Sequence, residues 1–193
     1  MVFIFYRLKK IGADLYTGAC HKWLCAPKGS AFLYARKEIQ EWLDPLVISW
    51  GYKPEPGYGS GVQYIDYHEW QGTRDISPFL SVPTAIDFQA QHDWGTVQAD
   101  CHKLAVETRQ RLNELLAKPP ICGEDLFSQM FAVQLPREID LQRLKTRLYE
   151  EFSIEVPVYE WNKRSMLRVS IQGYNVQSDV DRLVSALEQI LMG

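Results

Sequence analysis

The amino-acid sequence predicts an α/β protein, because strand-like and helical patterns both occur and follow one another along the chain. Three short runs of apolar, β-prone residues, at 2–6, 13–17 and 30–35, predict strands near its start. Residues 81–116 are long enough for two helices or one bent helix. From about Gln129 onward, strand-like and helical segments alternate. This last part predicts a small α/β domain with helices on one face of a sheet.

The first half of the chain also contains segments that neither periodicity fits. The turn Pro27-Lys28-Gly29 leads into the third predicted strand, so we expect a loop between the second and third strands. Residues 38–43 resemble one or two helical turns, which Pro45 ends. Residues 51–61, GYKPEPGYGSG, are so rich in Gly and Pro that they predict another loop.

The second half is predicted in more detail from its apolar spacing. The long helical stretch has an apolar stripe of Ala105, Leu112, Leu115 and Leu116, and Pro119-Pro120 ends it. We then expect a strand at 129–135, a helix with Leu141, Leu144, Leu148 and Phe152 on one face, and strands at 154–159 and 166–171 joined by a polar turn at 161–164. A capping box, Ser178-x-x-Asp181, predicts the start of the last helix.

Composition limits the classes of partner. The 193 residues are 46% hydrophobic and carry a formal net charge of -3, which does not favour nucleic acid as a partner. No stretch approaches the roughly 20 apolar residues of a membrane span. The cysteines Cys20, Cys25, Cys101 and Cys122 occur without a secretory signal, so we expect reduced thiols in a cytoplasmic protein.

The pair His21-Lys22 is the first candidate for chemistry, because it lies on the loop between two predicted strands. A lysine whose pKa is lowered there could act as a nucleophile and form a Schiff base. From spacing alone, an exposed loop lysine beside a packed Trp23 is the simpler interpretation. Cys20, His21 and Cys25 lack a fourth ligand at a fitting spacing, so we expect no zinc site.

Four separated motifs, in order, favour the chemical interpretation. They are GADLYTGACHKWLCAPKGSAFLY, PLVISWGY, EWQGTRDISPFLSVPTAIDF and LRVSIQGYNVQSDVDRLVSAL. Together they resemble the class V aminotransferases, which are pyridoxal 5'-phosphate (PLP) enzymes of the aspartate aminotransferase fold. The isopenicillin-N-epimerase-like branch is most similar, and the resemblance extends from about Gly12 to the end of the chain.

The resemblance implies a role for five residues. Lys22 matches the lysine that binds the cofactor covalently, and His21 matches a neighbour that helps to hold the cofactor phosphate. Gly72 and Thr73 match a pair that reaches the partner subunit's phosphate in the family's homodimer. Arg168 matches the arginine that binds the substrate α-carboxylate, a task that suits a planar guanidinium. Without the resemblance, Thr73 would be an ordinary turn residue and Arg168 a solvent-facing strand residue.

Two departures from the family pattern limit what is expected of this chain. Ala19 stands where the family usually has Asn or Ser three residues before the lysine. Only 21 residues precede Lys22, whereas the family has a large-domain segment there that contacts the cofactor ring. The sequence therefore predicts a C-terminal portion of the PLP-transferase fold that is weakly active or inactive alone.

These expectations divide the chain into three parts. Residues 1–80 are the remnant of the PLP-binding large domain, 81–118 are connecting helices, and 119–193 are a C-terminal small α/β domain. The function expected is that of a PLP-dependent enzyme acting on an amino acid by epimerase-like or aminotransferase-like chemistry. A non-catalytic interaction domain without cofactor is the alternative. A cysteine-desulfurase-like activity is less favoured, because Cys122 follows Pro119-Pro120 and is not plainly placed to accept sulfur.

Overall fold

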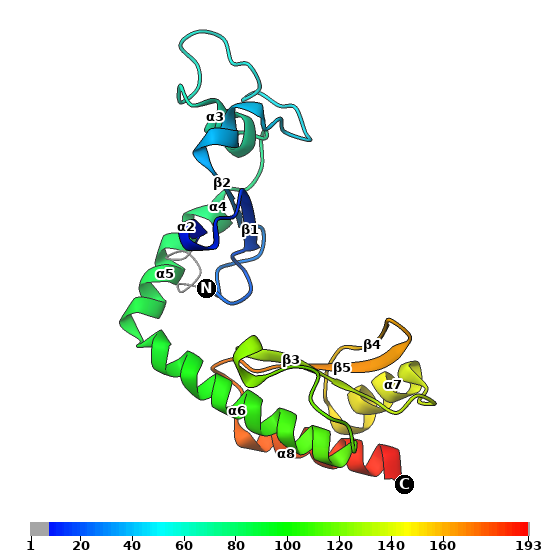
Figure 1. Cartoon of the computed structure of the whole chain (residues 1–193). Coiled ribbons are helices and arrows are strands. Elements are labelled where there is room, and N and C mark those ends of the chain that lie inside the picture. Colours follow the sequence, from blue (N-terminus) through cyan, green and yellow to red (C-terminus); the bar gives the residue numbers. More distant parts are fainter. Residues whose placement is uncertain (1–7, 193) are drawn as a thin grey trace. The chain divides into compact units, whose positions relative to one another are not determined.

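The computed structural model describes residues 8–192, and its helices and strands form two compact units. The chain divides between His92 and Asp93, and each unit is described here by itself (Figure 1). The predicted strand at 2–6 lies outside the described residues. This division falls inside the segment 81–118, and the three-part organisation expected from the sequence stays a prediction.

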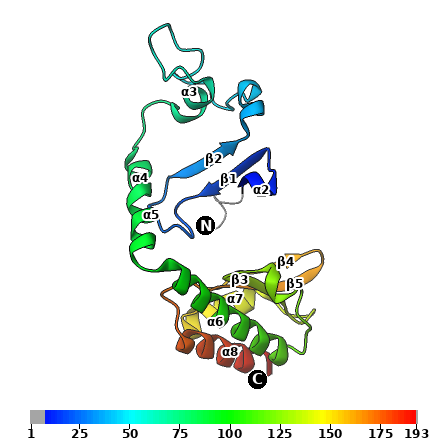
Figure 2. The same ribbon diagram turned by 60° about the vertical axis from the view of Figure 1, so that its left-hand side comes forward.

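The first unit is built on a two-stranded antiparallel ribbon (Figure 2). Its elements are α2 (Leu8–Ile11), β1 (Leu15–Ala19), β2 (Ala31–Ala35), the 3-10 helix η1 (Lys37–Trp42), α3 (Gln63–Glu69), α4 (Ser77–Leu80) and α5 (Val82–Gln91). The two strands pair from Leu15 opposite Ala35 to Ala19 opposite Ala31. Both predicted strands are therefore confirmed, the first with bounds shifted by two residues, and η1 confirms the helical turn expected at 38–43.

The Gly- and Pro-rich segment 51–61 is the predicted loop, and it is held against α3, a short helix that the sequence analysis did not predict. Asp66 of α3 is buried, and its carboxylate accepts a hydrogen bond of 2.7 Å from the Ser60 amide. Gly51 packs so closely on the helix that a Cβ at this position would lie 1.8 Å from the Asp66 carbonyl oxygen. The loop thus requires Gly51 for close approach of two backbones.

The second unit is a three-stranded antiparallel sheet covered by helices on one face (Figure 1). Its elements are α6 (Trp94–Leu115), the 3-10 helix η2 (Glu124–Leu126), β3 (Met130–Gln134), α7 (Leu141–Phe152), β4 (Val158–Trp161), β5 (Arg164–Ser170) and α8 (Gln177–Met192). The strand order is β3-β5-β4. The expected small α/β domain with helices on one face of a sheet is confirmed, and it includes the long helix α6.

Alternation along the strands builds the core of the second unit. Phe131 and Val133 of β3, with Leu167 and Val169 of β5, are buried against the helices. The helices contribute a set of fully buried leucines, Leu112, Leu144, Leu148 and Leu187. Since successive strand residues point to opposite faces, residues between these, such as Arg168, belong to the face away from the helices.

Two details of the second unit differ from the sequence-based expectation. The strand expected at 154–159 begins only at Val158, because Ser153 ends α7 in a left-handed conformation and Pro157 has no amide to donate to a ladder. The capping box at Ser178 and Asp181 is wrong. The carboxylate of Asp179 accepts from the Val176 amide at 3.1 Å instead, and Asp181 pairs with Arg111 at 2.6 Å.

The stretch 81–116 forms two helices, α5 and α6, rather than one bent helix. Asp93 lies between them with a left-handed backbone, φ 45°, which interrupts the helical path. The polar turn expected between the last two strands is also confirmed. Asn162 and Lys163 both have positive φ, as a two-residue hairpin turn between twisted strands requires.

The close approach of Gly51 to α3 gives a direct test of the loop geometry. We expect Gly51→Ala to lower the free energy of unfolding of the first unit by about 3 kcal/mol or more, because the new methyl group overlaps a backbone oxygen. Gly57→Ala is the matched control, since it adds only left-handed strain of about 1 kcal/mol in open space. Urea denaturation followed by circular dichroism measures both, and equal losses would contradict the close packing.

Candidate functional site

The lysine loop, residues 20–30, joins β1 to β2 and is closed by its own backbone. The Cys20 amide donates to the Ser30 carbonyl at 3.0 Å, and the Cys20 carbonyl accepts from the Ala26 amide at 3.1 Å. Inside this closure, the Cys25 amide donates to the Lys22 carbonyl at 3.0 Å and forms a tight turn. The backbone around Lys22 is therefore fixed although it lies in a loop.

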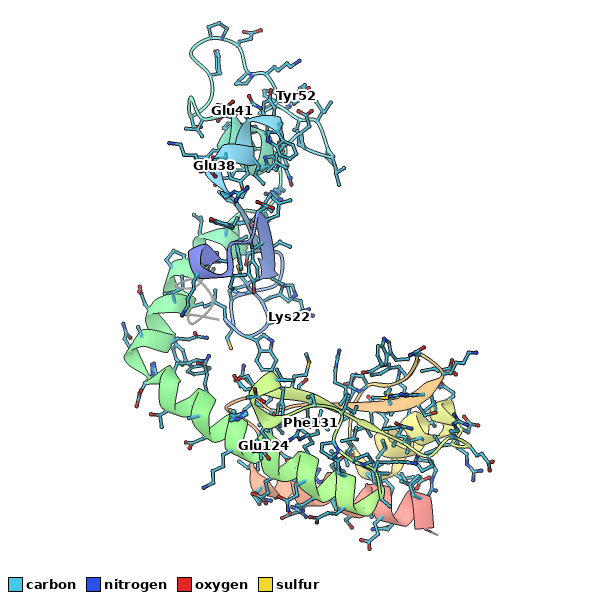
Figure 3. The ribbon with its side chains drawn as sticks, in the orientation of Figure 1. Lys22, Glu38, Glu41, Tyr52, Glu124 and Phe131 are labelled. Atoms are coloured by element: carbon cyan, nitrogen blue, oxygen red, sulfur yellow. The ribbon has the colours of Figure 1, made fainter. Side chains whose placement is uncertain are left out.

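His21 and Lys22 are both exposed at this turn. Figure 3 labels Lys22 on the loop. In the part of the chain that the structure describes, the amine of Lys22 has no hydrogen-bond or ion-pair partner. The adjacent Cys25 has φ 62°, and burial raises the pKa of its thiol. The loop thus presents a partner-free primary amine on a constrained backbone.

One face of helix α5 packs against the lysine loop. The loop residues Cys20, Leu24 and Ala26 form a small buried cluster against Val82 and Ala85 of α5. One turn further along the same helix, the Gln89 side chain is 2% exposed, and its Nε2 donates to the Trp23 carbonyl at 2.9 Å. The sequence analysis missed Gln89, although its spacing of four from Ala85 places it on the same helical face.

Gly72 and Thr73 lie on a second loop of the first unit, between α3 and α4. Gly72 has φ 93°, a conformation that favours glycine, and a Cβ there would lie 3.2 Å from the Ser49 hydroxyl. Thr73 is exposed. Hydrogen bonds from the Ser77 side chain and then from the Ser77 amide lower the pKa of the Asp75 carboxyl. The amide bond is 2.9 Å long and fixes the start of α4. No hydrogen bond joins this loop to Lys22 among the described residues.

Arg168 belongs to the second unit, whereas the four residues above belong to the first. It lies on the central strand β5 opposite Ala132, and its amide donates to the Pro157 carbonyl at 3.0 Å. Arg168 is exposed, and it borders a cavity of about 290 Å³ that Asp179 and Arg182 also line. Four of the site residues predicted from the sequence therefore lie in the first unit, as one adjacent pair on each of two loops. The fifth, Arg168, lies on the sheet of the second unit.

Several other features bear on the chemistry. Among the described residues, Cys20, Cys25, Cys101 and Cys122 form no disulfide. Residues 8–192 contain no cluster of His, Cys, Asp and Glu that could hold a metal ion. Within the same described range, we find no helix with the length and apolar character needed to cross a membrane.

Comparison with known families gives this arrangement a context. The family model described as aminotransferase class-V matches residues 4–183, which include both loops, α5 and β5. The chain belongs to the class-V aminotransferase family. The family predicted from the four sequence motifs is therefore confirmed.

Individual relatives agree with this assignment. They also show what share of each relative's length the chain covers. An isopenicillin N epimerase from Amycolatopsis lactamdurans is 37% identical over 193 residues, covering 95% of this chain and 48% of the relative. Among solved structures, the apo cysteine desulfurase from Thermococcus onnurineus NA1 superposes with a TM-score of 0.78 at 21% identity, covering 96% of this chain and 49% of that one. This class-V chain spans about half the length of the relatives it matches.

The solved neighbours also confirm the predicted fold class, since the chain adopts about half of their α/β fold. One of them is a variant of the lyase C-DES with glycine covalently linked to its PLP cofactor, with a TM-score of 0.70 and 14% identity, covering 94% of this chain and 47% of that one. Residues of the lysine loop and of the loop between α3 and α4 fit such a group chemically. Lys22 provides a free amine for the cofactor aldehyde, and His21 and Thr73 provide exposed hydrogen-bond donors for a phosphate.

The left-handed backbone of Cys25 gives a test of how the lysine loop is constrained. We expect Cys25→Gly to leave the free energy of unfolding unchanged or to raise it. Cys25→Val should lower the free energy of unfolding by about 1–2 kcal/mol relative to Cys25→Gly. The same two substitutions at Lys28, where φ is not positive, serve as the control. Thermal denaturation would reveal the difference, and identical midpoints for the two Cys25 variants would contradict the assigned backbone.

Proposed function

We propose that this class-V chain is part of a PLP-dependent enzyme that acts on an amino acid, with epimerase-like or aminotransferase-like chemistry. The observation that carries the proposal is the lysine loop, where a constrained backbone presents the partner-free amine of Lys22. An ordinary surface lysine has no need of a backbone that contacts of a separate helix restrain. The similarity to an isopenicillin N epimerase favours racemisation or epimerisation among the reactions of the family.

In this proposal Lys22 has two tasks. Its Nζ would hold the cofactor covalently until the substrate amine takes its place, and would then take the proton from the substrate α-carbon. When bound, PLP supplies an electron sink that stabilises negative charge at that carbon. Return of the proton by Lys22 to the same face would restore the original configuration, so inversion of the centre would need a second acid on the opposite face. The lysine alone does not select between this outcome and transamination.

Binding of substrate and of phosphate falls to the other four residues. Arg168 binds the α-carboxylate through two parallel hydrogen bonds, for which an exposed, charged guanidinium is suited. His21 and the Gly72-Thr73 pair bind the cofactor phosphate with a ring nitrogen, backbone amides and a hydroxyl. The positive φ of Gly72 keeps the backbone at this loop free of a side chain.

We further propose that the enzyme is a homodimer in which Gly72 and Thr73 of one subunit contact the phosphate bound by the other. A run of large apolar side chains near this loop in the sequence supports a protein interface in the first unit. These exposed residues are Trp42, Leu46, Val47, Ile48, Trp50 and Trp70. Where such side chains form a contiguous exposed patch, the patch normally contacts another protein surface.

A non-catalytic interaction domain is the second candidate function, because the first unit exposes the large apolar side chains named above. A cysteine-desulfurase-like reaction would need a reactive thiolate to accept sulfur. Burial raises the pKa of the Cys25 thiol, which lowers its thiolate fraction at neutral pH and disfavours this assignment.

The covalent role of Lys22 is tested with PLP itself. We expect the purified chain mixed with PLP to develop a visible absorption band that borohydride removes, with the reduced adduct on the peptide containing Lys22. Lys22→Ala should abolish the band, and Lys28→Ala, a matched change in the same loop, should retain it. Absence of the band from the wild-type chain would favour the non-catalytic alternative.

The role of Arg168 is tested with amino acids added to the PLP-loaded protein. We expect Arg168→Gln to weaken the amino-acid-dependent spectral change by roughly 10- to 100-fold in affinity, since a charge-assisted pair is lost. Arg164→Gln is the control, because Arg164 lies on the same face of the same strand. Equal effects of the two substitutions would remove Arg168 from the substrate site.

A further inference from the structure

Gln89 is a buried polar residue in an otherwise apolar contact between α5 and the lysine loop. Its Nε2 donates to the Trp23 carbonyl, but its Oε1 is buried without a hydrogen-bond partner among the described residues. The preceding contacts of the same helix, Val82 and Ala85, are apolar. Gln89 is therefore a polar residue in an interface that is otherwise formed by apolar side chains.

Packing alone does not account for a glutamine here. A buried acceptor without a partner is unfavourable, and such groups are rare in folded proteins. A methionine would fill a similar volume and would bury no polar atom. If the position served only to hold α5 against the loop, an apolar side chain would be the more stable choice. The property that glutamine adds is the hydrogen bond to the Trp23 carbonyl.

That hydrogen bond acts on the main chain beside Lys22. The turn at Lys22 is otherwise held by bonds within the loop, from Cys25 to Lys22 and from Ala26 to Cys20. Gln89 adds a restraint from a separate helix, 66 residues further along the chain. The Cys25 thiol also lies 3.9 Å from the Trp23 carbonyl, which is a weaker contact. The Trp23–Leu24 peptide, at the centre of the turn from Lys22 to Cys25, is thus tied to α5.

We propose that Gln89 is a positioning residue for Lys22: it fixes the turn so that the amine projects in one direction toward the cofactor. The proposal rests on the cofactor role of Lys22 proposed above. It assigns to α5 a function beyond support, because the helix sets the direction of the reactive side chain. Burial of Oε1 without a partner is unfavourable, and this is the cost of keeping the Nε2 donor at a buried position.

The test compares Gln89→Met with Gln91→Met, an exposed residue on the same helix. Each protein is treated with PLP, reduced with borohydride and digested, and the adducts on Lys22 and Lys28 are quantified by mass spectrometry. We expect the wild-type label to favour Lys22, and Gln89→Met to lower the Lys22-to-Lys28 ratio about fivefold, as loss of one ordinary hydrogen bond would. Gln91→Met should not change the ratio.

A purely structural role predicts a different pattern, so thermal stability is measured in parallel. We expect the unfolding midpoint of Gln89→Met to be equal to that of the wild type or higher, since the unpartnered oxygen is removed. A lower midpoint with an unchanged labelling ratio would overturn the positioning role. Gln89→Glu, which keeps the length of the side chain but removes the Nε2 donor, should lower the ratio in the same way.

Hydrogen exchange without cofactor separates this proposal from the proposed function. We expect the amides of residues 20–26 to exchange about fivefold faster in Gln89→Met than in Gln91→Met, because one restraint on the loop is lost. Unchanged exchange would overturn the proposal even if Lys22 binds PLP. Faster exchange with an unchanged Lys22-to-Lys28 ratio would overturn the positioning role and leave the role of Lys22 intact. A wild-type chain that shows no preference for Lys22 would overturn both proposals.

Discussion

The closure of the lysine loop by Cys20 is the constraint on which the candidate site depends. One residue uses its amide to bond Ser30 and its carbonyl to bond Ala26, so the hairpin ladder continues past β1 while the chain between these residues turns outward. Its side chain meanwhile points into the small cluster with Leu24 and α5. Main-chain and side-chain contacts at the same residue therefore restrain the loop. Lys22 is exposed to solvent, but these contacts restrain its backbone.

The elements that the sequence predicted well are those with strong local signals. The strand pair β1–β2, the helices α7 and α8 and the hairpin between β4 and β5 all follow from apolar spacing or turn chemistry over fewer than about 20 residues. The errors arise where a local pattern competes with a tertiary contact. Asp181 had the right spacing for a capping box, but a nearby Arg111 on α6 binds its carboxylate instead. The residues at 154–157 are β-prone, but Pro157 and the end of α7 keep them out of the sheet.

The candidate site was predicted unevenly for a related reason. Lys22, His21, Gly72, Thr73 and Arg168 were found from motifs, which identify residues without giving their surroundings. Gln89 and Asp66 were not found, because a buried glutamine and a buried aspartate have no sequence signature apart from their place on a helical face. Their importance depends on the backbone groups that they bind, the Trp23 carbonyl for Gln89 and the Ser60 amide for Asp66. Both backbone groups lie in loops, whose structure cannot be predicted from the spacing of apolar residues.

The two units differ in how far their own residues can stabilise them, and this difference bears on the proposed chemistry. The second unit has a continuous core formed by a sheet and three helices. The first unit has a two-stranded ribbon, which is marginal by itself. Among the described residues, its buried cluster at the lysine loop consists of Cys20, Leu24 and Ala26, with partly buried neighbours packed against them. Four of the five proposed site residues belong to this less stabilised unit. A ligand that binds only the folded form adds to stability by an amount that grows with the logarithm of its concentration relative to Kd, so a cofactor bound at Lys22 would stabilise the unit with the smaller core. Binding and order in the first unit are thus expected to be coupled, whereas the second unit can hold Arg168 in place without a ligand.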